Sequence, residues 1–234
     1  MLTPHAEEYL EAIYRLGGQQ SPVHLSLLAE CLNLSAASVN EMVRRLEEQA
    51  LVHYMPYKGV QLGPEGLCKA LAILRRHRLW ERFLTDLLGL SWDLVHEEAC
   101  RLEHAASDLV TERLADLLQH PGRCPHGKPM PQPGCQPIAQ PEAFPLSSLQ
   151  ADQTATVAYI AREEPQLLRY LDTLGLLPDT QVMVQAVAPF DGPLTIQVNS
   201  TQHVIGYQVA STIYVNQIVD EQSAIHQTTT GDTE

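Results

Sequence analysis

The chain has 234 residues, of which 44% are hydrophobic, and carries a formal net charge of −13. It is long enough to bury two or three small cores, whereas no apolar run approaches the roughly 20 residues needed to span a bilayer. The N-terminus lacks the features of a signal peptide, and five scattered cysteines without a Cys-x-x-Cys pair disfavour a disulfide framework, so we expect a cytoplasmic protein with reduced thiols.

The acidic charge does not exclude DNA binding, because residues 1–75 carry six basic and eight acidic side chains and are close to neutral. In this region a threonine followed by a proline predicts a helix over residues 4–16, which a pair of glycines ends. Two short helical patterns follow, over residues 23–32 and 36–48. This order is typical of a helix-turn-helix, with a generic pair of helices as the alternative.

The second helix of this pair predicts the DNA contacts. Its apolar residues form one buried stripe, so the small polar side chains at its leading end face outward. Residues 51–62 alternate like two short strands about a Lys-Gly turn, which predicts the wing of a winged helix. The residues that we expect to contact DNA are Ser35, Ala37, Ser38, Asn40, Arg44, Arg45 and Lys58.

Two long helices are predicted next, over residues 67–88 and from Ser91 to about Gln119. Their short connection favours antiparallel neighbours, and their apolar excess suits a homodimer interface. Successive residues of a helix are rotated by about 100° around its axis. On the second helix this rotation places imidazole, thiol and carboxylate groups in one stripe that covers about a quarter of the circumference. This stripe predicts a metal site, with a solvated face as the alternative, and consists of His96, Cys100, Glu103 and His104.

Two further pairs of side chains have the spacing of metal ligands. Glu8 and Glu11 lie three positions apart on the first helix, and His77 and Glu81 lie four positions apart on the first long helix. Each pair is also compatible with a surface contact, and the acids are compatible with a favourable interaction with the helix dipole.

Residues 121–145 hold eight of the sixteen prolines and predict a linker. Within it, Cys124, His126 and Cys135 lack the fourth ligand of a zinc site, so we do not expect zinc there. Beyond the linker, short alternating runs and one helix, over residues 165–174, favour a small β-barrel. Its strands are expected at residues 155–160, 181–184, 194–198, 203–206 and 213–215, and the tail from residue 221 is expected to be disordered.

Together these segments resemble the diphtheria toxin repressor and manganese transport regulator family of metal-activated bacterial repressors. The resemblance covers about residues 3–131 and is carried by residues 7–14, 75–84, 95–104 and 124–127. The C-terminal part is similar to the SH3-like (FeoA-like) domain that ends many members. The resemblance implies a mainly α winged helix-turn-helix domain (1–64), a helical metal-binding and dimerisation domain (65–120), a proline-rich linker (121–149), a small all-β SH3-like barrel (150–220) and a tail (221–234).

The resemblance also implies about two metal ions per protomer. It assigns to the first ion Glu8, Cys100, Glu103 and His104, with Glu11 as a further acid, and to the second ion His77, Glu81 and His96. In iron-type members the C-terminal domain adds ligands to the second metal, and the best-placed acids here are Glu163 and Glu164. The resemblance implies that the Cys-Pro-His-Gly turn at residues 124–127 has a structural role and does not bind metal.

The metal preference follows from one position. The iron-sensing branch has a methionine where this chain has Glu8, and a hard carboxylate in place of a soft thioether favours Mn(II) over Fe(II). Cys100 is the iron-type choice and points the other way.

We therefore predict a homodimeric, Mn(II)- or Fe(II)-activated repressor of metal-ion homeostasis genes that binds double-stranded operator DNA and no membrane, and that is not an enzyme. One alternative is a winged-helix regulator that senses a non-metal small molecule. A second is a zinc hydrolase in which His96-Glu97-x-x-Cys100 imitates a His-Glu-x-x-His helix. The hydrolase is disfavoured because cysteine replaces the second histidine and Glu97 lies away from the middle of the ligand arc.

Overall fold

The computed structural model describes residues 2–136, 138 and 141–220, which form two compact units. The first unit comprises Met1–Trp80, Glu97–Pro121 and Met130–Ile138, and the second comprises Glu81–His96, Gly122–Pro129 and Ala139–Glu234. Among the described residues, no helix has both the length and the apolar character to cross a bilayer. The predicted disordered tail from residue 221 lies outside the described residues.

The first unit begins with the predicted helix-turn-helix and wing. Its elements are α1 (Pro4–Arg15), α2 (Leu25–Leu32), α3 (Ala36–Glu48), β1 (Val52–Met55), β2 (Gly59–Leu62), the first part of α4 (Pro64–Asp86), most of α5 (Val95–Glu103) and α6 (Asp108–Leu117). The Thr3 hydroxyl accepts from the Ala6 amide at the start of α1, and Ser35 accepts from Ser38 at the start of α3. Both caps satisfy amides that the first turn leaves unpaired; the cap at Thr3 was predicted from the sequence, and the cap at Ser35 was not.

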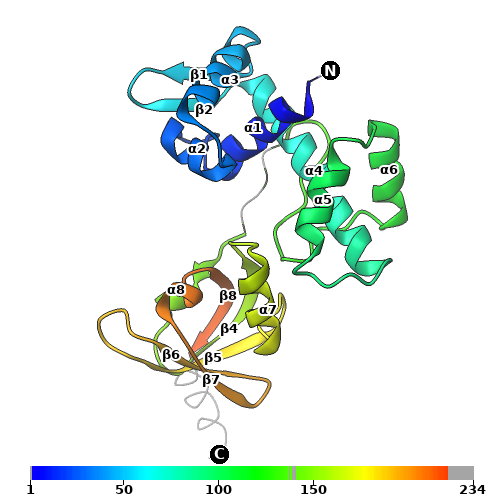
Figure 1. Ribbon diagram of the computed structural model, residues 1–234. Coiled ribbons are helices and arrows are strands. Elements are labelled where there is room, and N and C mark those ends of the chain that lie inside the picture. The colour runs from blue at the N-terminus through cyan, green and yellow to red at the C-terminus, as the bar shows by residue number, and fades with distance from the viewer. Residues whose placement is uncertain (1, 137, 139–140, 221–234) are drawn as a thin grey trace, which may run out of the picture. The chain divides into compact units, whose positions relative to one another are not determined.

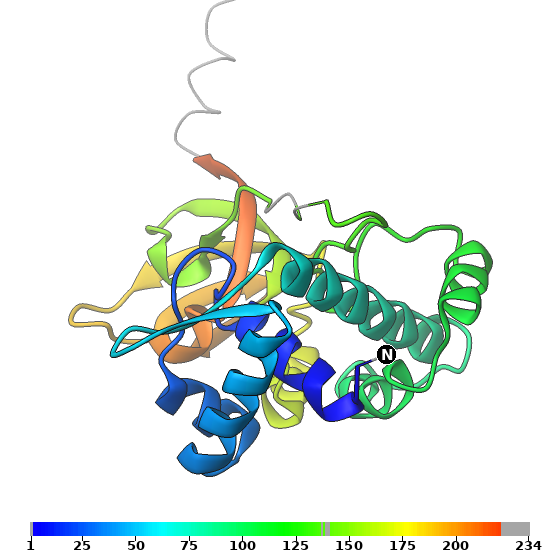
Figure 2. The same cartoon turned by 90° about the horizontal axis from the view of Figure 1, so that it is seen from above.

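The wing hairpin projects beyond α2 and α3 (Figures 1 and 2). Val23, which precedes α2, exchanges two backbone hydrogen bonds with Val60 of β2, at 2.8 and 2.9 Å. Gly59 permits this approach, because a Cβ at that position would lie 2.0 Å from the Val23 carbonyl oxygen. Fully buried apolar side chains of α1, α2, α3 and the hairpin then form one continuous core, which includes Tyr9, Leu28, Val43 and Val60.

The long helix predicted from Ser91 to about Gln119 is wrong as a single element. The chain forms two helices, α5 and α6, because the Ser107 hydroxyl accepts from the Val110 amide and starts α6 as a new helix. Ser91 is not the cap of α5, which begins at Val95, and its hydroxyl instead donates to Asp93. The metal-site residues therefore lie on, or directly after, a helix of nine residues.

The expectation that all thiols are reduced is also wrong, since Cys68 and Cys135 form a disulfide within the first unit. Their Cα atoms lie 4.6 Å apart although 67 positions separate them in sequence. The bond fastens the proline-rich segment Met130–Ile138 to the start of α4. Arg75 lies beside this connection, and its guanidinium donates to the Pro131 carbonyl at 3.4 Å.

The second unit is built on an antiparallel sheet of six strands in the order β3-β8-β4-β5-β6-β7 (Figure 1). All five predicted strands are present, and the short β3 was not predicted. Side chains of the sheet and of α7 share one apolar core with Trp92. The elements are β3 (Phe144–Pro145), the 3-10 turn η1 (Leu146–Ser148), β4 (Gln153–Ile160), α7 (Pro165–Thr173), β5 (Gln181–Val187), β6 (Leu194–Val198), β7 (Thr201–Ile205), α8 (Tyr207–Ala210) and β8 (Ile213–Asp220).

Asp93 connects the segment before α5 to α7 in this unit. The Ser91 hydroxyl donates to one carboxylate oxygen, and the Arg169 guanidinium donates to the other at 2.8 Å. The hydrogen bond from Ser91, with a smaller contribution from Arg169, lowers the pKa of Asp93 although its burial opposes this.

We expect Asp93→Asn to lower the free energy of unfolding of the second unit by about 2 kcal/mol near pH 7, because a buried carboxylate loses charged hydrogen bonds. Since the folded-state pKa is lowered, this stabilisation is complete above the unfolded-state pKa of about 4 and is lost as the pH falls through the folded-state value. Urea unfolding near pH 7 and near pH 3 measures it, with Asp172→Asn as an exposed control on α7. An equal difference at both pH values would contradict the assignment.

Candidate metal centres

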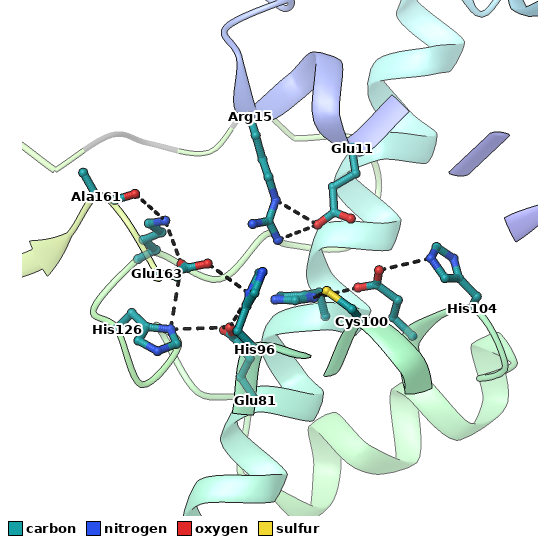
Figure 3. A network of polar contacts seen from close by, with 12 residues as sticks. Glu11, Arg15, Glu81, His96, Cys100, His104, His126, Ala161 and Glu163 are labelled. Carbon is teal, nitrogen blue, oxygen red and sulfur yellow. Dashed lines mark hydrogen bonds and ion pairs between the residues drawn. The ribbon is translucent and has the colours of Figure 1, made fainter. Parts of the chain in front are cut away.

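The first cluster lies in the first unit, where α1, α4 and α5 each supply a buried ligand-type side chain. Donor atoms of Glu11, His77 and Glu103 all lie within 4.8 Å of one another. Nδ1 of His77 is 2.8 Å from Oε2 of Glu103 and 3.9 Å from Sγ of Cys100. Three ligands predicted for the first ion, Glu11, Cys100 and Glu103, are therefore brought together, and His77, which the resemblance assigned to the second ion, joins them. Figure 3 shows Glu11 and Cys100 among these residues.

His104, directly after α5, joins this cluster to α1 through a different acid from the one predicted. Its Nε2 lies 3.2 Å from Glu103, and its Nδ1 lies 2.8 Å from Oε2 of Glu7. Glu8 points elsewhere: its side chain is half exposed and pairs with His5 at 3.2 Å. Sequence reasoning missed Glu7, although its spacing of four from Glu11 places both acids on one face of α1.

The first cluster concentrates acidic groups away from water. Burial raises the pKa of Glu103, while the hydrogen bond with His77 opposes the rise. Arg15 binds Oε1 of Glu11 through two nitrogens, at 2.8 and 3.1 Å, and Arg76 lies 3.1 Å from Glu7. Buried carboxylates are costly unless charge compensates them, and imidazole, carboxylate and thiolate groups together suit a first-row divalent metal. The donor set therefore fits such an ion.

The second cluster lies in the second unit and contains the predicted ligands Glu81 and His96. Nδ1 of His96 is 3.5 Å from Oε1 of Glu81 and 3.1 Å from Oε2 of Glu163 (Figure 3). Of the two acids considered in the C-terminal domain, Glu163 joins this cluster and is buried. Glu164 pairs instead with Arg162, and both side chains are exposed.

Two further members of the second cluster, Cys124 and His126, come from the Cys-Pro-His-Gly turn and were not predicted as ligands. Donor atoms of Glu81, Cys124 and His126 lie within 4.8 Å of one another, and all three residues are buried. Nδ1 of His126 is also 3.8 Å from Oε1 of Glu163. The sequence did contain a signal, the Cys-x-His spacing, but the remaining donors are 28 or more positions away in the chain.

The ring of His126 has a defined orientation. Its Nε2 lies 2.8 Å from the Trp92 carbonyl oxygen, which only accepts hydrogen bonds, so Nε2 carries a proton. This leaves Nδ1 facing Glu81 and Glu163, the arrangement in which metal-binding histidines are typically held. Burial opposes the charged ring, but Cys124, Glu81 and Glu163 outweigh it and raise the pKa of His126 to about 10. The residues of the second cluster thus fit a divalent cation as well.

The predicted DNA-contacting residues lie on the outside of the first unit. The side chains that are exposed are Ser35, Ala37, Ser38, Arg44, Arg45 and Lys58, and Asn40 is half-buried. Arg44 stacks over the Tyr54 ring of the wing at 5.9 Å, and Arg45 pairs with Glu41. The structure therefore presents the leading end of α3 and the wing tip to solvent together.

Comparison with known proteins adds independent information on each segment. Residues 1–60 match the family model described as iron dependent repressor, N-terminal DNA binding domain. Residues 64–132 match the model described as iron dependent repressor, metal binding and dimerisation domain, and residues 144–217 match the FeoA domain. The three matches follow one another along the chain in the order that the resemblance implied.

Individual relatives agree with these matches. The iron-dependent repressor IdeR of Mycobacterium leprae is 32% identical over 195 residues, which span 79% of this chain and 85% of that protein. The diphtheria toxin repressor of Corynebacterium efficiens is 42% identical over 130 residues, and this match spans 56% of either chain. A solved manganese-dependent transcriptional repressor in complex with manganese is 37% identical, with a TM-score of 0.82 over 90% of this chain and 98% of that one.

These matches join a winged helix-turn-helix, a helical metal-binding domain and an SH3-like FeoA domain in one chain, and the Mycobacterium leprae relative matches 79% of this chain. The chain therefore belongs to the iron-dependent repressor family, which includes the diphtheria toxin repressor.

Proposed function

We propose that this protein is a homodimeric, metal-activated repressor that binds double-stranded operator DNA in the cytoplasm and controls metal-ion homeostasis genes. The observation that carries the proposal is the first cluster, because it joins α1 of the DNA-binding domain to α4 and α5. One relative is described as an iron-dependent repressor and another as a manganese-dependent repressor, which supports a divalent first-row ion as the effector.

The ligands of the first ion would be drawn from Glu7 or Glu8 and from Glu11, His77, Cys100, Glu103 and His104, and those of the second from Glu81, His96, Cys124, His126 and Glu163. A bound divalent cation would add positive charge among these buried acids. Around it, Arg76 and His104 hold Glu7 of α1 at 3.1 and 2.8 Å, so α1 already has contacts with α4 and with the end of α5. Any ion that prefers one orientation of α1 shifts the population toward that orientation.

Reciprocity follows from this coupling. If metal raises the affinity for operator DNA by a given factor, operator DNA must raise the affinity for metal by the same factor. The DNA-bound protein is therefore expected to retain the ion against a chelator that removes it from the free protein.

Mn(II) is the proposed physiological metal, with Fe(II) as the alternative, because α1 offers the hard carboxylates Glu8 and Glu11. We expect Glu8→Met to shift the ratio of Mn(II) to Fe(II) affinities toward iron by about tenfold, since a thioether replaces a carboxylate ligand. Competition titrations with a chelating dye, run under anaerobic conditions, measure the ratio. Glu7→Gln is the matched variant. If the ratio of Mn(II) to Fe(II) affinities is unchanged in Glu8→Met but changed in Glu7→Gln, the metal ligand on α1 is Glu7 rather than Glu8.

An exposed apolar face supports the homodimer. Leu109, Val110 and Leu117 on α6 fall within about 100° of one another around the helix, and each is at least 45% exposed. Apolar side chains gathered on one face of a helix commonly mark an interface.

Fluorescence anisotropy tests the proposed function directly. A labelled fragment from upstream of a metal-uptake gene is titrated with protein in the presence of chelator, and then with Mn(II), Fe(II) or Zn(II). We expect the affinity to rise at least about 100-fold with the activating metal, equivalent to about 3 kcal/mol of coupling. Equal affinity with chelator and with every metal would contradict the proposal, and elemental analysis of the purified chain would then test for a non-metal regulator.

A further inference from the structure

Lys128 places a positive charge inside the second cluster. Its Nζ lies 2.7 Å from Oε1 of Glu163 and 3.1 Å from the carbonyl oxygen of Ala161. The side chain of Glu163 is 8% exposed and that of Lys128 is 20% exposed, so this ion pair is largely shielded from solvent. Figure 3 shows Ala161 and Glu163 of this network.

The backbone of the Cys-Pro-His-Gly turn holds Lys128 in this place. The Cys124 amide donates to the Lys128 carbonyl at 2.9 Å, and the Ile160 amide of β4 donates to the His126 carbonyl at 3.0 Å. Gly127 has a φ of +87°, and a Cβ there would lie 2.2 Å from the Ala158 carbonyl oxygen. The turn therefore cannot move away from β4 easily, and it delivers Lys128 to the same carboxylate that His126 faces.

The ammonium group and a divalent cation need the same oxygen. Oε1 of Glu163 is the atom that contacts Lys128 and that lies 3.8 Å from Nδ1 of His126, the proposed ligand atom. A cation bound there would also lie close to a like charge in a poorly solvated place, where repulsion is strong. Lys128 has a long flexible stem and its side chain is 20% exposed, so its displacement needs no backbone change.

We infer that Lys128 competes with the divalent cation for Glu163 and sets the metal affinity of the second cluster. This inference rests on the proposed function, in which the second cluster holds an ion. In the ion-free protein Lys128 neutralises Glu163, and loading requires the ammonium group to turn out to solvent. The second cluster consequently fills at a higher metal concentration than the same donors would without the lysine.

Cobalt(II) titration of the full chain tests this. In a Cys100→Ser background, the thiolate-to-cobalt absorption band reports Cys124 and hence the second cluster. We expect Lys128→Gln to bind cobalt(II) about tenfold more tightly, because glutamine keeps a hydrogen-bond donor and removes the competing charge. Lys128→Arg keeps the charge and should stay within about twofold of the parent. Melting curves of the ion-free variants verify that each is folded.

Arg162→Gln is the matched control. It removes the same charge one residue before Glu163, but Arg162 is 63% exposed and pairs with Glu164. Tighter binding in Lys128→Gln alone supports local competition. Equal tightening in Arg162→Gln, or unchanged or weaker binding in Lys128→Gln with a normal band, overturns the inference and leaves the proposed metal site intact. Absence of the band in every variant overturns the second metal site, and the inference with it.

Discussion

Glu103→Gln is expected to lower the Mn(II) affinity of the first cluster at least about 100-fold and to abolish metal-dependent operator binding. Glu103 is 1% exposed and contacts both histidines of the cluster, His77 at 2.8 Å and His104 at 3.2 Å. An amide has nearly the shape of the carboxylate but carries no charge, so the ion loses a central ligand. Isothermal titration with Mn(II), followed by anisotropy with operator DNA, measures both effects.

The fold should survive this substitution. Burial already raises the pKa of Glu103, which means that the ionised form is disfavoured there in the ion-free protein. A neutral glutamine therefore removes a desolvation cost as well as an ion pair. Glu98→Gln is the matched control, because Glu98 is on the same helix, is exposed and pairs with Arg101 at the surface. If Glu103→Gln and Glu98→Gln bound Mn(II) alike, Glu103 would not be a ligand.

Breaking the disulfide between Cys68 and Cys135 is expected to lower the free energy of unfolding of the first unit by about 4 kcal/mol. The bond closes a loop of 67 residues, and a cross-link over that span removes much of the entropy of the unfolded chain. Cys135→Ser in denaturant unfolding, and the parent with and without reductant, measure the effect. Cys31→Ser is the control, because Cys31 is a free, exposed thiol.

Thiol titration under denaturing conditions makes this result interpretable. The oxidised chain should show three reactive thiols, those of Cys31, Cys100 and Cys124, and the reduced chain should show two more. A gain of two thiols without any loss of stability would contradict the expected contribution of the cross-link.

Local signals were sufficient for most of the fold. The cap at Thr3, the two helical patterns over residues 23–32 and 36–48 and the alternation over residues 51–62 predicted the helix-turn-helix and its wing, because these elements depend on neighbouring residues. The division of α5 from α6 was missed although Ser107 carries the same kind of capping signal. Apolar residues recur at helical spacing from Ser91 to about Gln119, so the sequence pattern did not show the boundary between the two helices.

The candidate site depended more on tertiary structure. The helical spacing of Cys100 and Glu103 was enough to suggest ligands, but the choice between Glu7 and Glu8 depends on the rotation of α1 about its own axis, which helical spacing alone does not fix. Cys124 and His126 seemed one ligand short because Glu81 and Glu163 reach them from distant segments. The pairing of Cys68 with Cys135 likewise follows only from the packing of the proline-rich segment on α4.

The backbone bridge between Val23 and Val60 ties the hairpin to the segment that leads into α2 and the recognition helix α3. Because these elements also share one buried core, they move as a single body. We therefore expect the separation of the two DNA-contacting elements within a protomer to be the same with and without metal. In the proposed mechanism, metal changes the distance between the recognition helices of two protomers, so each half-site should keep its length while the preferred spacing between half-sites changes.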